Sequence, residues 1–193
     1  MGELNIKRRF PNPKELAQLM KFKKFIWNSR ERRLAGAHTI YDLRTIAKRR
    51  TPQAPFDYTD GSADQEISIT RARQAFEDIE FQPSVLKNVS ELDLGWDVLG
   101  KRVEMPIGIA PTGFTRMMHT EGEFAGATAA EKAGIPFSLS TMGTRSIEEI
   151  AGAAPSGTNW FQLYMWKDRE RSMALIDRAK ASGFEALMLT VDV

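Results

Sequence analysis

The sequence contains no cysteine and only two histidines, which excludes several kinds of chemistry before any motif is considered. Without cysteine the chain can form no disulfide, thiolate nucleophile or cysteine-ligated metal centre. The histidines, His38 and His119, are far apart in the sequence and are not paired with carboxylates at the spacing of a metal site. We therefore predict no bound metal, and we interpret His119, beside the start of a predicted helix, as a structural residue.

Long apolar runs and a strong excess of one charge are also missing. No window approaches 18 consecutive apolar residues, and the N-terminus lacks the apolar core of a secretion signal. This pattern favours a cytoplasmic location. The net charge of +2 is too small to predict a nucleic-acid partner.

Basic residues nevertheless concentrate in the first fifty positions, where Lys23 and Lys24 adjoin Phe25, Ile26 and Trp27. Such charge runs usually form a solvated helix face, which is the interpretation we favour. The alternative is an arm that docks on a partner or peripherally on the inner face of a membrane, because apolar side chains are interleaved with the lysines.

The sequence pattern divides the chain into two parts. Residues 1–100 are predicted to form a helical lead-in, and residues 101–193 a regular series of strands and helices. In the first part, Pro13–Met20 opens one helical segment. A second covers Thr39–Ala47, with apolar residues at helical spacing and Thr39 as its predicted N-cap, and Pro52 ends the pattern.

From Met105 onward, short apolar runs alternate with amphipathic segments of about 8–14 residues, as in a series of strands and helices. The predicted strands are residues 106–110, 135–140, 160–165 and 186–191. Residues 120–123 and 146–149 both have the pattern of a capping box at a helix N-terminus, and Asp168 is a predicted N-cap. Gly134 and Gly183 are predicted to end helices in the left-handed conformation.

These alternating elements predict an α/β fold, either a doubly wound sheet or part of a (β/α)8 TIM barrel. No Gly-x-Gly-x-x-Gly turn follows the first predicted strand, which disfavours the doubly wound sheet. Each predicted strand also ends in polar residues suited to the rim of a barrel. A barrel needs roughly 250 residues and about 90 follow the start of its first strand, so we predict the first half of a barrel, truncated after strand four.

Polar residues recur where active sites of barrel enzymes gather, at the carboxyl ends of strands. They are Thr112, Ser140 with Thr141, Gln162 with Tyr164, and Thr190 with Asp192. Hydroxyl and amide groups are neutral donors and acceptors, which suit the carbonyl and imide edge of a flat heteroaromatic cofactor.

Six segments in order resemble motifs of the FMN-dependent 2-hydroxy-acid oxidase and dehydrogenase family, in its bacterial L-lactate dehydrogenase branch. They are Phe56–Asp64, Ile109–Gly113, Met118–Glu123, Leu139–Thr141, Trp160–Tyr164 and Leu189–Asp192. The resemblance covers roughly residues 40–193. It implies that residues 101–193 form the first four strands of an FMN-binding barrel and that residues 1–100 include a segment that caps this barrel and carries a substrate-binding tyrosine. The alternative, a phosphate-binding barrel without flavin, lacks this set of tyrosines and polar strand ends.

The resemblance also implies roles for particular residues. Pro111, Thr112 and Gly113 would pass the flavin ring with their backbone, and glycine permits such a close approach. Ser140, Gln162 and Thr190 would hydrogen-bond the polar edge of the ring.

Two tyrosines and one aspartate are implied to act on the substrate. Tyr58 and Tyr164 would bind its carboxylate and its hydroxyl or keto oxygen, so that Tyr164 is both a substrate-binding and a catalytic candidate. Asp192 would hydrogen-bond the catalytic histidine and steady its protonated form. That histidine, an arginine for the substrate carboxylate and a lysine at the flavin would all follow Val193, and we expect residues 1–193 alone to be inactive.

The implied reaction is the oxidation of a small L-2-hydroxy acid, L-lactate to pyruvate, with electrons passed to a quinone, cytochrome or similar acceptor by a homo-oligomeric complete protein. An oxidase or monooxygenase that uses oxygen is the first alternative. Family oxidases often have tryptophan at the position of Met142 and alanine at that of Gly113, which favours the dehydrogenase. The second alternative is a half-barrel without catalysis, which would expose strand edges and aggregate or pair with another half.

Overall fold

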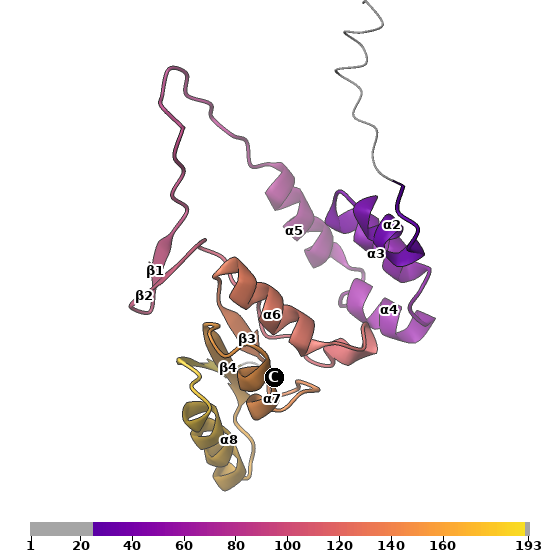
Figure 1. Cartoon of the computed structure of the whole chain (residues 1–193). Helices are drawn as coiled ribbons and strands as arrows, with labels where there is room; N and C mark the ends of the chain where they lie inside the picture. The colour runs from indigo at the N-terminus through magenta and orange to yellow at the C-terminus, as the bar shows by residue number, and fades with distance from the viewer. Residues whose placement is uncertain (1–24, 192–193) are drawn as a thin grey trace, which may run out of the picture. The chain divides into compact units, whose positions relative to one another are not determined.

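A computed structural model describes residues 25–191 (Figure 1). The described residues form two compact units, which divide between Arg49 and Arg50. The sequence pattern placed a boundary near residue 100, where predicted helices give way to alternating strands and helices. That boundary separates types of secondary structure rather than compact units, and it stays a prediction. The predicted helix at Pro13–Met20 and the candidate Asp192 both lie outside the described residues.

The first unit contains two short helices in its described part, α2 (Ser29–Ala35) and α3 (Ile40–Lys48). Helix α3 begins as predicted. The Thr39 hydroxyl accepts a hydrogen bond from the Asp42 amide, and the Asp42 carboxylate accepts one from the Thr39 amide. Neither helix buries a residue fully.

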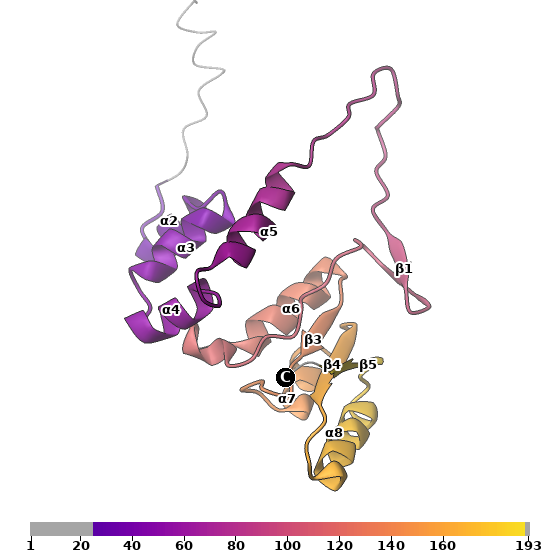
Figure 2. The ribbon, with the colours of Figure 1, turned by 180° about the vertical axis from the view of Figure 1, so that it is seen from behind.

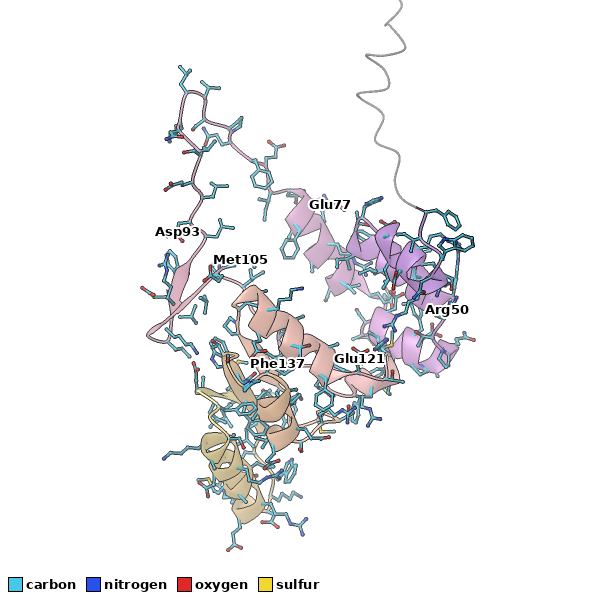
Figure 3. The ribbon with its side chains drawn as sticks, viewed as in Figure 1. Arg50, Glu77, Asp93, Met105, Glu121 and Phe137 are labelled. Atoms are coloured by element: carbon cyan, nitrogen blue, oxygen red, sulfur yellow. The ribbon has the colours of Figure 1, made fainter. Side chains whose placement is uncertain are left out.

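The second unit opens with α4 (Gln53–Asp60) and α5 (Ile67–Glu77), followed by a small antiparallel hairpin of β1 (Trp96–Val98) and β2 (Lys101–Val103). The hairpin turns at Leu99 and Gly100, both with positive φ, as a two-residue turn between twisted strands requires. Residues 79–95, between α5 and the hairpin, contain no helix or strand and expose several large apolar side chains (Figure 3).

A parallel three-stranded sheet forms the centre of the second unit, in the order β3 (Phe137–Leu139), β4 (Asn159–Tyr164) and β5 (Ala186–Thr190). Helix α6 (Glu123–Ala133) precedes β3, α7 (Ile147–Ala153) connects β3 to β4, and α8 (Arg169–Ala181) connects β4 to β5 (Figure 2). Strand and helix therefore alternate as predicted. Parallel neighbours place their carboxyl ends at one edge of the sheet.

The predicted strand at 106–110 is reduced to one residue. Ile109 pairs in parallel with Phe137 through two backbone bonds, in which the Ile109 amide donates to Pro136 and the Ser138 amide donates to Ile109. The prediction of a full strand was wrong because Pro111, two residues after Ile109 in the ladder, has no N–H to donate.

The helix boundaries follow the predicted caps in all but one case. Ser146 and Glu149 form the expected capping box of α7, and the Asp168 carboxylate accepts from the Arg171 amide at the start of α8. The capping box predicted at Thr120 does not form, since Gly122 is the N-cap of α6 and the Glu123 side chain binds elsewhere.

The core lies between the sheet and helices α6, α7 and α8. Its members are Ala127, Ala130, Ile135, Phe137, Leu139, Ile147, Ile150, Ala154, Phe161, Leu163 and Ala179. A Cβ atom on Gly126 would lie 2.8 Å from the Phe137 ring, so α6 can approach β3 this closely only with glycine there. Among residues 25–191, no helix combines the length and apolarity needed to cross a membrane.

Candidate functional site

A chain of side-chain hydrogen bonds joins the carboxyl ends of the three parallel strands. The Ser140 hydroxyl, just after β3, donates to Oε1 of Gln162 in β4 at 3.2 Å. Nε2 of Gln162 donates to Oγ1 of Thr190, the last residue of β5, at 2.7 Å. Ser140, Gln162 and Thr190 were predicted from the sequence to share one rim, and the structure places them in contact.

The backbone determines which way the Gln162 amide faces. The Thr141 amide N–H lies 3.1 Å from Oε1 and can only donate, so the atom facing it must be the oxygen. Both acceptor positions of Oε1 are then filled by Ser140 and Thr141. Among the described residues Nε2 has one partner, Thr190, so its second hydrogen is available to a ligand.

The rim therefore offers two donors to a ligand, the second Nε2–H of Gln162 and the hydroxyl proton of Thr190, whose oxygen accepts from Gln162. Gln162 and Ser140 are almost completely buried, which strengthens such bonds and keeps the side chains in one arrangement. The carbonyl oxygens at the edge of an isoalloxazine ring are acceptors, so the donors at this rim fit that edge of FMN.

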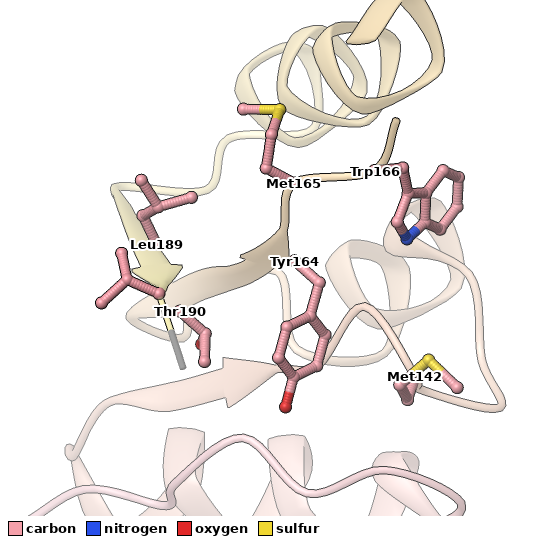
Figure 4. Close-up of a pocket in the computed structure, with 7 residues that line it drawn as sticks. Met142, Tyr164, Met165, Trp166, Leu189 and Thr190 are labelled. Atoms are coloured by element: carbon pink, nitrogen blue, oxygen red, sulfur yellow. The ribbon is translucent and has the colours of Figure 1, made fainter. Parts of the chain in front are cut away.

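An open hollow of about 980 Å³ lies beside this rim. Its lining residues are Met142, Tyr164, Met165, Trp166, Leu189, Thr190 and Val191. In Figure 4 the Tyr164 ring lies between Thr190 on one side and Met142 on the other. The hollow thus places one phenol and one hydroxyl within a mostly apolar wall, as binding sites for small molecules commonly do.

Tyr58 lines a second hollow of about 460 Å³ together with Thr112, Gly113 and Phe114, so two of the three residues predicted to pass the flavin lie in its wall. Thr112 does not join the chain of hydrogen bonds, since its hydroxyl points back to the Ala110 carbonyl at 3.4 Å. Pro111, the third of the residues predicted to pass the flavin, is half-buried and does not line the hollow.

The walls of the two hollows meet at Met142. The Phe114 amide donates to the Met142 carbonyl at 3.0 Å, and a Cβ atom on Gly113 would lie only 2.9 Å from Cβ of Met142. Glycine at position 113 is therefore required for the close approach of these two segments. Tyr58 and Tyr164 lie in neighbouring hollows rather than in one.

Glu123, which the sequence pattern placed in a helix cap and in a segment of the family resemblance, is a buried carboxylate. It is 3% exposed and accepts hydrogen bonds from the amide and the hydroxyl of Thr144, each at 2.7 Å. Burial raises the pKa of the Glu123 carboxyl, but the hydrogen bonds outweigh burial and hold the pKa below its ordinary value. Glu123 thereby fixes the loop after β3 that carries Met142.

Thr141 is the second residue whose contacts the sequence did not reveal. Its hydroxyl donates to the Gln162 carbonyl at 2.6 Å and accepts from the Tyr164 amide at 3.1 Å. Its place beside Ser140 identified it as a rim residue, but only the register of the sheet shows what it binds.

Within residues 25–191, no three His, Asp or Glu side chains gather as a metal site would require. The site described here consists of neutral hydroxyl, amide and phenol groups. Such groups can orient a polar ring and an anionic substrate, and a redox cofactor would have to supply the electron transfer.

Comparison with known proteins gives a consistent result. Residues 47–193 match the family described as FMN-dependent dehydrogenase. The chain is 57% identical over 188 residues to a "Putative L-lactate dehydrogenase" of Mycobacterium tuberculosis, covering 97% of this chain and 45% of that protein. It is 43% identical over 157 residues to an "L-lactate oxidase" of Nostoc, covering 79% of this chain and 43% of the relative.

Among solved structures, mandelate oxidase is similar with a TM-score of 0.75 and 36% identity, over 81% of this chain and 45% of that structure. The predicted α/β fold, as the first half of a barrel, is confirmed by this similarity. The chain spans a little under half the length of the relatives it matches.

Proposed function

Since the chain belongs to the FMN-dependent dehydrogenase family, we propose that the complete protein containing it oxidises an L-2-hydroxy acid to the corresponding 2-keto acid. L-Lactate is the proposed substrate, pyruvate the product, and a quinone or similar carrier the electron acceptor. The likeness to the Mycobacterium relative, at 57% identity against 43% for the oxidase of Nostoc, supports the dehydrogenase assignment.

The observation that carries this proposal is the chain of side-chain hydrogen bonds that joins Ser140, Gln162 and Thr190 beside Tyr164. The three strands supply the set, and its free donors point to a ligand that presents acceptors along one edge. When bound, FMN supplies the acceptor for the two electrons that the hydroxy acid loses. Gln162 and Thr190 would hold its polar edge by donating hydrogen bonds to the carbonyl oxygens.

The tyrosines would bind the substrate. The phenol of Tyr164 can donate a hydrogen bond to the hydroxyl oxygen at C2 of the substrate and then to the keto oxygen of the product. Tyr58 would donate to the carboxylate from the neighbouring hollow, and Met142 and Leu189 would exclude water. The group that removes the hydroxyl proton and the cation that binds the carboxylate are proposed to come from the part of the barrel outside residues 1–193.

The experiment uses the complete protein. We expect bound FMN after purification, reduction by L-lactate under anaerobic conditions, and turnover with a quinone or dye. Tyr164→Phe should lower kcat/KM by roughly 10- to 100-fold, the effect of losing a hydrogen bond to a charged or charge-developing group. Tyr41→Phe, in α3 with an exposed ring, is the matched control and should leave kcat/KM unchanged.

The alternatives give different results in the same assays. Stoichiometric hydrogen peroxide in place of dye reduction would identify an oxidase. FMN uptake without turnover of any 2-hydroxy acid would favour a non-catalytic half-barrel protein, and failure to take up FMN would refute the proposal.

A further inference from the structure

Strand β3 leaves the sheet earlier than β4 does, and this difference affects both site residues on β4. The last register pair of β3 and β4 is Leu139 with Phe161, whereas β4 continues to Tyr164. If the parallel ladder went on, Thr141 would lie opposite Leu163. Its backbone would then donate to the carbonyl of Gln162 and accept from the amide of Tyr164.

The side chain of Thr141 makes both of those bonds instead. Its hydroxyl donates to the Gln162 carbonyl at 2.6 Å and accepts from the Tyr164 amide at 3.1 Å. The backbone amide of Thr141 is thereby released from the ladder and donates to Oε1 of the Gln162 side chain at 3.1 Å. One residue thus binds the backbone on either side of Leu163 and also orients the amide of Gln162.

We propose that Thr141 is a positioning residue for the reaction, which holds the cofactor-facing Gln162 and the substrate-facing Tyr164 in a single register through its hydroxyl. The proposal rests on the function proposed above. Gln162 and Tyr164 are two residues apart on a strand, so their side chains project from the same face of the sheet. A displacement of β4 at this point would therefore move both groups together.

The chemistry of the position restricts which residues can serve. A hydroxyl can donate one hydrogen bond and accept another at the same time, which is what a peptide group does in the ladder. Serine retains this ability. Valine has nearly the shape of threonine but leaves the Gln162 carbonyl and the Tyr164 amide without their partner in a part-buried setting.

The test compares Thr141→Val and Thr141→Ser in the complete protein. We expect Thr141→Val to lower kcat/KM for L-lactate by on the order of 10- to 100-fold, since small displacements of positioned groups have effects of this size. Its FMN absorption spectrum should shift as well, because Gln162 turns away from the ring. Thr141→Ser should retain kcat/KM within about threefold and keep the wild-type spectrum.

Thr128→Val is the matched control for the loss of a threonine hydroxyl. The Thr128 hydroxyl also donates to a backbone carbonyl, that of Phe124 at 2.7 Å, but it lies on the exposed side of α6. This variant should retain the kcat/KM and the flavin spectrum of the wild-type protein.

A second measurement does not depend on turnover. Hydrogen exchange of the Tyr164 amide should be slow in the wild-type protein and in Thr141→Ser, and faster in Thr141→Val, because the hydroxyl is its acceptor. If Thr141→Val does not fold, hydrogen exchange of the Tyr164 amide in the wild-type and Thr141→Ser proteins still shows whether the hydroxyl at position 141 protects that amide. A Tyr164 amide that exchanges as fast as an exposed one in the wild-type protein would overturn the proposal.

The kinetic result can also overturn it. If Thr141→Val folds and keeps the wild-type kcat/KM and flavin spectrum, Thr141 is a structural residue only. Failure of the wild-type protein to bind FMN or oxidise any hydroxy acid would instead refute the proposed function, and the positioning role of Thr141 in that reaction would fall with it. The exchange data would still show whether Thr141 holds Tyr164, which separates the two failures.

Discussion

The close contact between Gly113 and Met142 leads to a prediction that the structure makes quantitative. Replacing Gly113 by alanine would place a Cβ atom 2.9 Å from Cβ of Met142 and 3.5 Å from its carbonyl oxygen. Carbon atoms in contact prefer about 3.5–4.0 Å, so the first distance cannot be kept. The Met142 atom adjoins the backbone, so a rotation of the side chain cannot relieve the clash and the backbone must move.

Two further contacts limit that movement. The Phe114 amide donates to the Met142 carbonyl at 3.0 Å, and the Thr144 amide in the same loop is held by the buried Glu123. Overpacking of a closely packed site costs about 1–3 kcal/mol. We expect Gly113→Ala to lower the free energy of unfolding by this amount, and to displace Met142 in the hollow that also contains Tyr164.

Guanidinium unfolding of the complete protein measures the effect, read as a lower midpoint at an unchanged slope. Gly152→Ala is the matched control, because a Cβ atom there meets nothing within 4 Å and the position lies within α7. It should stabilise the protein by about 0.5–1 kcal/mol.

A double-mutant cycle gives the sharpest test of the reasoning. The Met142→Gly change removes the atom against which the new methyl presses, so the double variant should be more stable than the sum of the single changes predicts, by about 1 kcal/mol or more. Strict additivity, or a Gly113→Ala protein as stable as the wild type, would refute the argument from the 2.9 Å contact.

Three further predictions concern the loops and helices around the site. Glu123→Gln should destabilise the protein by about 1–3 kcal/mol near neutral pH by weakening the bonds from Thr144. The folded pKa of Glu123 lies below its ordinary value of 4.5, so this stabilisation is present above that value and is lost as the pH falls through the folded pKa. The unfolding free energies of the wild-type and Glu123→Gln proteins should therefore converge in acid. The Arg178 guanidinium donates two hydrogen bonds to Glu148 and lowers the pKa of that carboxyl to about 2, but the pair is exposed. Glu148→Gln should therefore cost less than about 1 kcal/mol, and the difference should shrink in high salt. Ser146→Ala removes the N-cap of α7 and should cost about 1 kcal/mol in the same unfolding assay, whatever the salt concentration.

Much of the fold was predictable because its signals are local. The capping box of α7 depends on Ser146 and Glu149, three residues apart, and the left-handed Gly134 ends α6 as its position after the helical pattern indicated. Apolar runs with β propensity marked β3, β4 and β5 within one or two residues. Tertiary contacts reinforce these preferences here rather than oppose them.

The incorrect predictions have particular physical causes. The strand at 106–110 was predicted from its apolar residues, but Pro111 cannot continue the ladder and only Ile109 pairs. The capping box at Thr120 was predicted from Glu123, whose carboxylate binds Thr144 instead, 21 residues away in the sequence. A side chain with two possible partners is not assigned by spacing alone.

The sequence predicted which residues form the candidate site better than it predicted how their side chains are arranged. Parallel strands bring their carboxyl ends to one edge, so Ser140, Gln162 and Thr190 could be expected to meet, and they do. Thr112 could be expected there for the same reason, yet its hydroxyl turns back to Ala110 and it lines the hollow of Tyr58.

The order of strands and helices, the polar residues at the strand ends and the family resemblance could all be derived from the amino-acid sequence alone, because they depend on residue type and short spacing. Three contacts became visible only in the folded chain: the Thr141 hydroxyl makes the bonds that the β3 backbone would have made, Glu123 binds the loop after that strand, and Gly113 lies against Met142. Each of these contacts joins segments more than twenty residues apart. Their partners are set by the register of the sheet and the packing of α6, which no local pattern encodes.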